Sequence, residues 1–135
     1  MITFAKKNLD VVRNGKLIFY KLLRNNVDLY QDFCEDICKD AILSKELNII
    51  HTYMNLLADS NLQLPTAKFN SIKHGKNVVG HEFKSKHLRV YVIKEDPNVY
   101  VILGGMKTTQ KSDVSKFKKF IKEYNQFINN KIDLS

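Results

Sequence analysis

The stretch Gly80–Asp113, GHEFKSKHLRVYVIKEDPNVYVILGGMKTTQKSD, decides the fold of this chain. Three runs within it have the alternating or apolar pattern of β-strands: residues 81–84, 87–94 and 99–103. The segment Glu95–Asn98 contains Pro97 between Asp and Asn, which is typical of a tight turn. A glycine pair and two lysines lie in residues 104–111, directly after the third run. We therefore expect three consecutive strands that end in a basic loop.

The rest of the chain predicts one further strand and three helices. Residues 17–23 are apolar enough for a strand, and Asp28 with Gln31 has the spacing of a helix capping box. Ser44 is expected to cap a second helix, and Ser112 a third that closes the chain. Helices joined by a few residues form antiparallel hairpins. The prediction is an α+β fold: a small twisted antiparallel sheet with an N-terminal helical hairpin and a C-terminal helix.

Composition favours one soluble domain. The chain has 135 residues, of which 44% are hydrophobic, so a single domain over residues 1–135 is expected. No apolar run is long enough to span a membrane, and residues 1–7 lack the apolar core of a signal peptide, so we expect a cytoplasmic protein. Cys34 and Cys38 are the only cysteines, and no histidine is near them in sequence. We interpret them as reduced, buried thiols and expect neither a metal nor another cofactor.

The excess of positive over negative charge is confined to one half of the sequence. Residues 1–67 contain eight Lys and Arg against eight Asp and Glu, whereas residues 68–135 contain 14 against six. The whole net charge of +8 thus belongs to the half that contains the deciding stretch. A one-sided excess of this kind favours a polyanionic partner such as a nucleic acid, although a basic protein without such a partner is the alternative.

Two segments carry a resemblance to a known family. KHLRVY at residues 86–91 and VILGGMKTTQKSD at residues 101–113 resemble the RelE/ParE/HigB superfamily of type II toxins, including phage-derived RelE-like proteins. The resemblance covers about residues 17–125, which would be the core of the domain. It implies a fold with helices packed on one side of the sheet. It also implies a toxin that stops growth, most often as a ribosome-dependent mRNA endonuclease, with a cognate antitoxin as an acidic or helical peptide partner.

The resemblance also implies a set of site residues. Arg89 falls where the family has its mid-strand arginine, and Lys107 at the first lysine after the glycines. Lys84 and Lys111 match two further basic positions, and Lys86 lies beside them. Lys84, Lys86 and Lys111, together with His81, are the expected RNA-binding residues. No membrane partner is expected.

The chemistry is metal-independent attack of the RNA 2′-OH on the neighbouring phosphate. Strand alternation places His87, Arg89 and Tyr91 on one face of residues 87–94. In this prediction Arg89 and Lys107 stabilise charge on the phosphate, while His81 or His87, with Tyr91 or a lysine as a substitute, transfers a proton. Each residue has a structural alternative: Arg89 can pair with Glu82, Tyr91 can pack against the last helix, and His87 and the lysines can simply be solvated.

Two other functions stay open at this stage. The first is a ParE-like toxin that poisons DNA gyrase without cutting RNA, which needs the fold but not the row of site residues. The second is a noncatalytic module that binds nucleic acid or protein. The combination of Arg89, Lys107 and a titratable neighbour favours the endonuclease over both.

Overall fold

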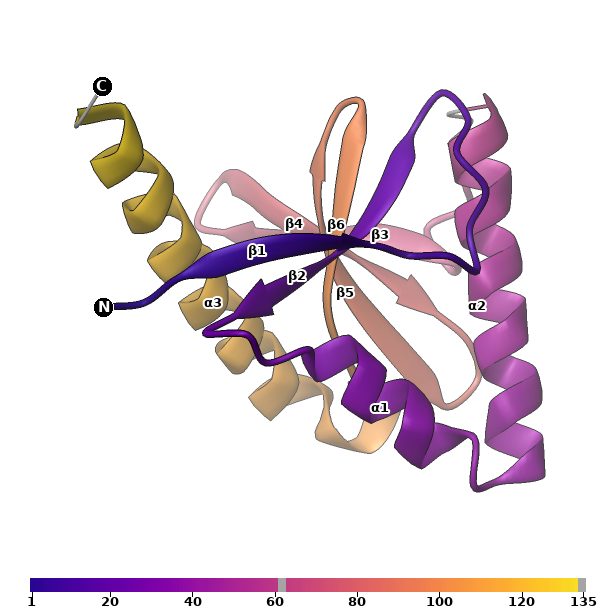
Figure 1. Cartoon of the computed structure of the whole chain (residues 1–135). Coiled ribbons are helices and arrows are strands. Elements are labelled where there is room, and N and C mark those ends of the chain that lie inside the picture. Colours follow the sequence, from indigo (N-terminus) through magenta and orange to yellow (C-terminus); the bar gives the residue numbers. More distant parts are fainter. Residues whose placement is uncertain (61–62, 134–135) are drawn as a thin grey trace.

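The computed structural model of the chain contains one six-stranded sheet with helices against both of its faces (Figure 1). It describes residues 1–60 and 63–133, with side chains as far as residue 130. The strands, in chain order, are β1 (Phe4–Asn8), β2 (Ile18–Arg24), β3 (Phe69–His74), β4 (Asn77–Lys84), β5 (Leu88–Glu95) and β6 (Asn98–Met106). The three predicted strands of the deciding stretch are therefore confirmed as the end of β4, β5 and β6.

The sheet is mixed, not wholly antiparallel. Its strand order is β1-β2-β6-β5-β4-β3, and β2 pairs with β6 in parallel while all other neighbours are antiparallel. The parallel pair arises because two helices carry the chain from β2 to the far side of the sheet. The chain then returns towards β2 through three hairpin reversals, so β6 arrives beside β2 in the same direction. The prediction of an antiparallel sheet is wrong at this one pair.

The helices are α1 (Leu29–Ile37), α2 (Ala41–Ser60) and α3 (Gln110–Asp133), the last preceded by the short η1 (Lys107–Thr109). The predicted N-terminal helical hairpin is wrong, because β1 and β2 come first and α1 packs chiefly along β6. The described part of the chain, residues 1–60 and 63–133, contains no helix with the length and apolarity to cross a membrane.

Local capping sets where the helices begin. The Asp28 carboxylate accepts a hydrogen bond from the backbone N–H of Gln31 at 3.0 Å, which confirms the expected cap of α1. Asp40, and not the predicted Ser44, caps α2, since its Oδ1 accepts from the N–H groups of Ile42 and Leu43. α3 begins at Gln110, two residues before the expected start.

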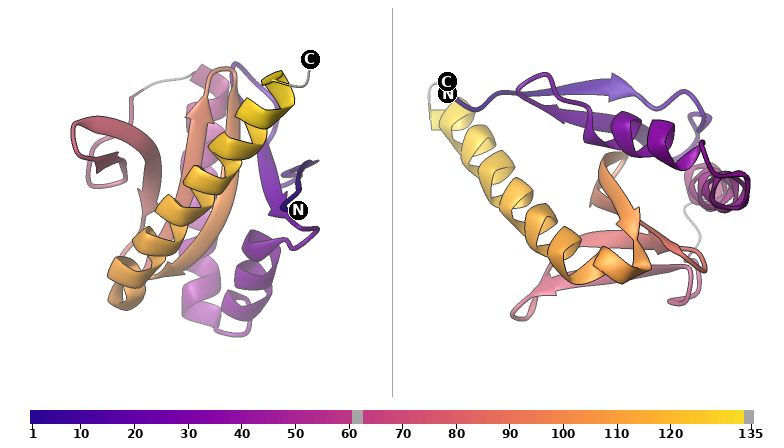
Figure 2. Two further views of the ribbon diagram at one scale, coloured as in Figure 1. Left: turned by 90° about the vertical axis from the view of Figure 1, so that its left-hand side faces the viewer. Right: turned by 90° about the horizontal axis from the view of Figure 1, so that it is seen from below.

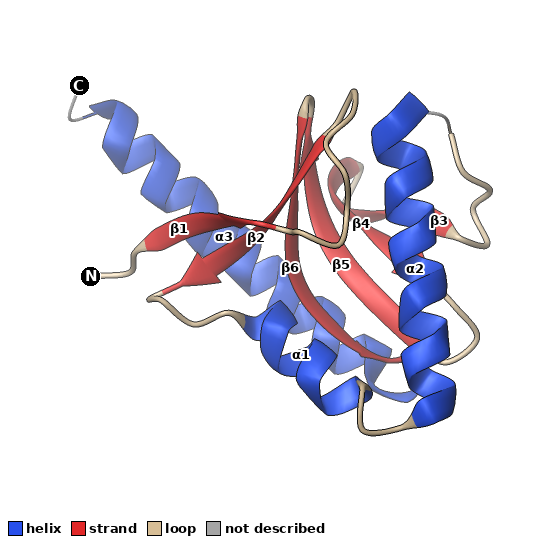
Figure 3. Cartoon of the chain, turned by 45° about the vertical axis from the view of Figure 1, so that its right-hand side comes forward, coloured by secondary structure: helices blue, strands red, loops and turns tan. Residues whose placement is uncertain are grey.

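Both faces of the sheet are covered, so the expectation of helices on one side is wrong (Figure 3). Leu88, Val90 and Val92 of β5 are buried in the cluster beneath α1 and α2. Tyr91 and Ile93 face the opposite way, into the cluster beneath α3. The two further views in Figure 2 show α3 running diagonally across its face from the end of β6. Because β5 is buried on both sides, only its ends can present side chains to a ligand.

The N-terminal residues, which have no clear sequence pattern, form an edge strand. β1 pairs with β2 from Phe4 opposite Arg24 to Asn8 opposite Tyr20. The Phe4 ring packs edge-on against Phe120 and Tyr124 of α3, with ring centroids 5.3 and 5.4 Å apart. The first strand and the last helix are thus joined through aromatic contacts.

Candidate functional site

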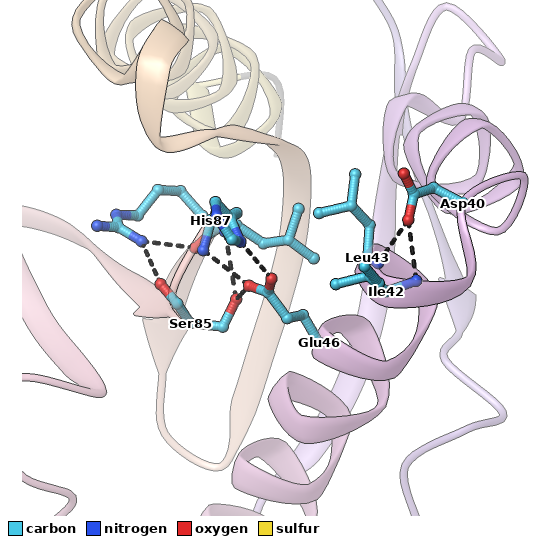
Figure 4. A network of polar contacts seen from close by, with 8 residues as sticks. Asp40, Ile42, Leu43, Glu46, Ser85 and His87 are labelled. Carbon is cyan, nitrogen blue, oxygen red and sulfur yellow. Dashed lines mark hydrogen bonds and ion pairs between the residues drawn. The ribbon is translucent and has the colours of Figure 1, made fainter.

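The turn between β4 and β5, residues 85–87, is bonded to a carboxylate of α2. Glu46 accepts hydrogen bonds from the Ser85 hydroxyl at 2.6 Å and from the backbone N–H of His87 at 2.7 Å. Its second oxygen lies 2.6 Å from Nδ1 of the His87 ring. Figure 4 shows this network, with Glu46 pointing from α2 towards Ser85 and His87.

The network fixes both the charge of Glu46 and the orientation of His87. Burial alone raises the pKa of Glu46, but the hydrogen bonds from Ser85 and His87 outweigh it, so the pKa lies below the usual value for a glutamate. An ionised carboxylate can only accept, so Nδ1 of His87 carries the proton in this bond. Nε2 is then the ring nitrogen left for other partners. The His87 side chain is 46% exposed, whereas that of Glu46 is only 11% exposed.

A histidine held in this way is equipped for proton transfer. Carboxylate–imidazole pairs orient the ring and stabilise the imidazolium that forms when Nε2 takes up a proton. The histidine lies at an exposed turn and its carboxylate partner is buried, so a substrate can reach one without displacing the other. The arrangement supplies one general acid–base group.

Basic residues surround the turn. The backbone N–H of Lys107 donates to the His87 carbonyl at 2.7 Å, which brings the end of β6 beside the turn. Lys86 and Lys107 are exposed, as is Lys111 in the first turn of α3, whereas Lys84 is half-buried at the end of β4. The structure therefore places the backbone of Lys107 beside that of His87, next to Lys86.

The predicted row of His87, Arg89 and Tyr91 is not formed. β5 begins at Leu88, so His87 lies outside the pleated strand and turns towards Glu46, whereas Arg89 and Tyr91 lie beneath α3. Arg89 is 7% exposed, and its Nη1 donates to the carbonyls of Ser85 at 2.7 Å and Leu88 at 2.8 Å. In this conformation Arg89 stabilises the turn from within and does not present a fork to a phosphate.

Arg89 and Tyr91 belong instead to a set of polar residues at the start of α3 and on the sheet face that it covers. We call it the α3-side cluster, and its members are the buried Glu82, Arg89, Tyr91 and Asp113, the half-buried Gln110 and the exposed Thr109. Among the described residues, Arg89 Nε and the Tyr91 hydroxyl have no hydrogen-bond partner, and Arg89 forms no ion pair with Glu82. The alternative of an Arg89–Glu82 pair is therefore wrong.

The contacts of Tyr91 confirm the alternative that it packs against the last helix. Its ring lies 5.6 Å from that of Phe117, centroid to centroid, and the residue is fully buried. Burial, with the nearby carboxylates of Glu82 and Asp113, raises the pKa of Tyr91 above its usual value. A buried phenol with a raised pKa keeps its own proton, so it can neither release that proton readily nor accept another, and Tyr91 is poorly suited to proton transfer.

His81 lies apart from His87. Its ring stacks on Phe69 with centroids 4.8 Å apart and the planes 7° from parallel. Burial and the charge of Lys94 lower its pKa. His81 lines a pocket of about 500 Å³ with Lys73 and Lys94, so it is not part of the site around His87.

Sequence reasoning missed Glu46, the residue that orients His87. A signal was present, because Glu46 stands at helical spacing between Leu43 and Ile50 on the stripe of α2 that faces the core. A charged residue at a core position requires a partner, and residues 85–87 provide it.

The cysteines do not form a site. Cys34 is half-buried and Cys38 is exposed, so the prediction of two buried thiols is wrong for Cys38, although both are free. Burial raises the pKa of the Cys34 thiol to about 11. The described residues contain no group of three or more His, Cys, Asp or Glu side chains that could hold a metal ion.

Comparisons of the chain with protein-family models, with curated proteins and with solved structures find no match. The site itself contains one oriented histidine, His87, which is exposed at a turn with lysines on either side.

Proposed function

We propose that this chain is the toxin of a type II toxin–antitoxin pair and acts as a ribosome-dependent mRNA endonuclease. The observation that carries the proposal is the exposed His87 ring held by the buried Glu46 carboxylate, with Lys86 and Lys107 beside it. Support also comes from the order of elements from β2 to α3, which is the order expected from the resemblance to RelE-like toxins apart from one additional strand, β3.

In the proposed reaction, Nε2 of His87 takes the proton of the RNA 2′-OH. The 2′-oxygen then attacks the adjacent phosphorus, the bond from phosphorus to the 5′-oxygen breaks, and the leaving oxygen takes a proton from the imidazolium or from water. Lys107 and Lys86 stabilise the negative charge that develops on the phosphate, and Lys84 and Lys111 contact flanking RNA. Glu46 is a positioning residue, because it acts through His87.

The roles first predicted for Arg89 and Tyr91 change in this proposal. Arg89 holds the carbonyls of Ser85 and Leu88 and so shapes the turn that carries His87. Tyr91 is part of the core. The exposed basic surface around the turn would be the part of the toxin that an acidic antitoxin peptide covers.

The test is induction of the chain in growing bacteria, with the ends of messenger RNA mapped. We expect growth arrest and cuts within translated codons, both lost in His87→Gln. Glu46→Gln should keep part of the activity but shift its pH dependence, whereas the exposed control Glu95→Gln should behave like the parent chain. Cleavage that persists in His87→Gln would contradict the proposed role of His87.

The burial of Arg89 favours a second candidate, a binding protein that does not cut RNA. Such a protein would use the basic surface alone, either on nucleic acid or on a target such as gyrase. Growth arrest with intact messages would identify this candidate. The absence of any toxicity would contradict both forms of toxin.

A further inference from the structure

A second basic surface lies at the far end of the sheet from His87. The turn end of the β3–β4 hairpin approaches the middle of α3 and encloses with it a groove of about 600 Å³. Figures 1 and 2 show the hairpin, in pink, beside α3. β4 runs from Asn77 at this end to Lys84 near the turn, a distance of about 23 Å at 3.3 Å per residue. The groove is therefore separate from the site around His87.

The side chains that line the groove share one chemistry. Lys118, Lys122, Asn125 and Asn129 follow helical spacing along the face of α3 that meets the hairpin. The remaining lining residues are His74, Val79, Lys119, Ile121 and Gln126. The lining contains no carboxylate, and within the described part of the chain none of its lysines is in an ion pair.

We infer that this groove binds the sugar-phosphate backbone of an RNA strand. Lysine, asparagine and glutamine are among the side chains that contact phosphate and sugar in nucleic-acid complexes, and the lysines give the groove the required charge. No Phe, Tyr or Trp lines the groove, and the contacts proposed here are to the sugar-phosphate backbone, so binding is expected to be independent of sequence. The choice of RNA as the nucleic acid rests on the proposed function, whereas the preference for a polyanion rests on the groove itself.

The groove gives the protein a means of holding RNA that does not depend on cleavage. A strand bound there would be anchored away from His87, so affinity and reaction would depend on different residues. Loss of the groove lysines should weaken binding and leave the Glu46–His87 contacts intact.

The test compares two double variants with the same loss of charge. Lys118→Gln/Lys122→Gln changes the groove, and Lys7→Gln/Lys16→Gln changes exposed lysines elsewhere. Fluorescence anisotropy would measure binding of a labelled 20-nucleotide oligouridine whose 2′-OH groups are methylated, so that it cannot be cut. At about 0.1 M salt the groove variant should bind on the order of tenfold more weakly. Its slope of log affinity against log salt should be less steep by about 1.4, because each lost contact to a single strand contributes about 0.7.

Equal losses in the two double variants would overturn the inference, since affinity would then follow net charge alone. So would a groove variant that keeps its RNA affinity but loses binding to a labelled polyglutamate peptide, because the groove would then be a peptide site. Asn125→Asp, which places a negative charge in the groove, should also weaken RNA binding, whereas Asn48→Asp on exposed α2 surface should not. Failure of the endonuclease proposal would instead appear as intact messages in cells, whatever the oligouridine affinity.

Discussion

Two buried glutamates, Glu46 and Glu82, stand on opposite faces of the sheet near the same turn, and their surroundings differ. Glu46 accepts three hydrogen bonds shorter than 2.8 Å and holds a histidine that is half exposed. Among the residues that the structure describes, Glu82 accepts only from the Gln110 side chain, at 3.1 Å to each oxygen. Around Glu82, Arg89 Nε and the Tyr91 hydroxyl are buried and have no hydrogen-bond partner within residues 1–60 and 63–130.

The difference separates a network suited to chemistry from one that is only structural. A buried donor or acceptor without a partner costs about 1–3 kcal/mol, so the α3-side cluster destabilises the fold unless apolar packing offsets it. Phe117 and the rest of the cluster beneath α3 supply that packing. The Glu46 network carries no such penalty among its described atoms, and its histidine can exchange protons with the outside.

The largest effect on stability should come from removing the Glu46 carboxylate, which accepts the three hydrogen bonds from Ser85 and His87. Glu46→Ala leaves the Ser85 hydroxyl and the His87 N–H groups without their acceptor, so we expect a loss of about 3 kcal/mol in the free energy of unfolding, measured by urea denaturation. The control Glu95→Ala changes an exposed glutamate and should cost no more than about 0.5 kcal/mol. Equal losses in the two variants would remove the distinction between Glu46 and a surface carboxylate.

Acid should remove part of the stability that the Glu46 carboxylate contributes. The folded-state pKa of Glu46 lies below its unfolded value of 4.5, so its stabilising effect is complete above pH 4.5 and is lost as the pH falls through the folded pKa. The free energies of unfolding of the parent chain and Glu46→Gln, measured from pH 7 to pH 3, should therefore converge in acid.

His51 makes a second pH-dependent contribution to the free energies of unfolding in that measurement. Burial lowers its pKa from 6.5 to about 4, so the unfolded chain binds a proton there that the folded chain does not, and both proteins lose stability between these values. Because this loss is common to both, it cancels in their difference. A difference that stays constant down to pH 3 would contradict the role assigned to the Glu46 carboxylate.

The smallest effect on stability should come from the α3-side cluster, at the Tyr91 hydroxyl. Tyr91→Phe deletes a buried hydroxyl that has no hydrogen-bond partner in the described part of the chain, so we expect a gain of about 0.5–1 kcal/mol in the free energy of unfolding. The matched control is Tyr30→Phe, since the Tyr30 hydroxyl lies 2.7 Å from His51 Nε2 and its removal should cost about 1–2 kcal/mol. RNA cleavage should be unchanged in Tyr91→Phe. A loss equal to that of Tyr30→Phe would show that the Tyr91 hydroxyl has a partner in solution.

Local patterns predicted most elements but not their assembly. The alternation in residues 87–94 and the turn at Pro97 are short-range signals, and β5 and β6 appear where they indicate. β1 gave no such signal, because its exposed lysines interrupt the apolar pattern and only Phe4 contacts the core. The parallel pairing of β2 with β6 depends on residues about 80 apart, which no local pattern can specify.

The site was predicted only in part, because the contacts that form it also join residues far apart in the sequence. Strand alternation correctly places Arg89 and Tyr91 on one face, but it cannot show that α3 covers that face or that His87 lies just outside β5. Glu46 and His87 are 41 residues apart, and their contact follows from the packing of α2 against the sheet. The identities of the basic residues could be predicted from sequence, whereas the burial of Arg89 could not.

The position of β6 has a consequence for synthesis of the chain. β6 lies between β2 and β5, yet it is the last strand to be translated. No sheet that contains both β2 and β5 can form until residues 98–106 have left the ribosome, and Phe4 has no aromatic partners until α3 follows. The Glu46 network connects α2, made before β6, to a turn beside β6. A nascent chain of this protein is therefore expected to lack the complete sheet until residues 98–106 have been made.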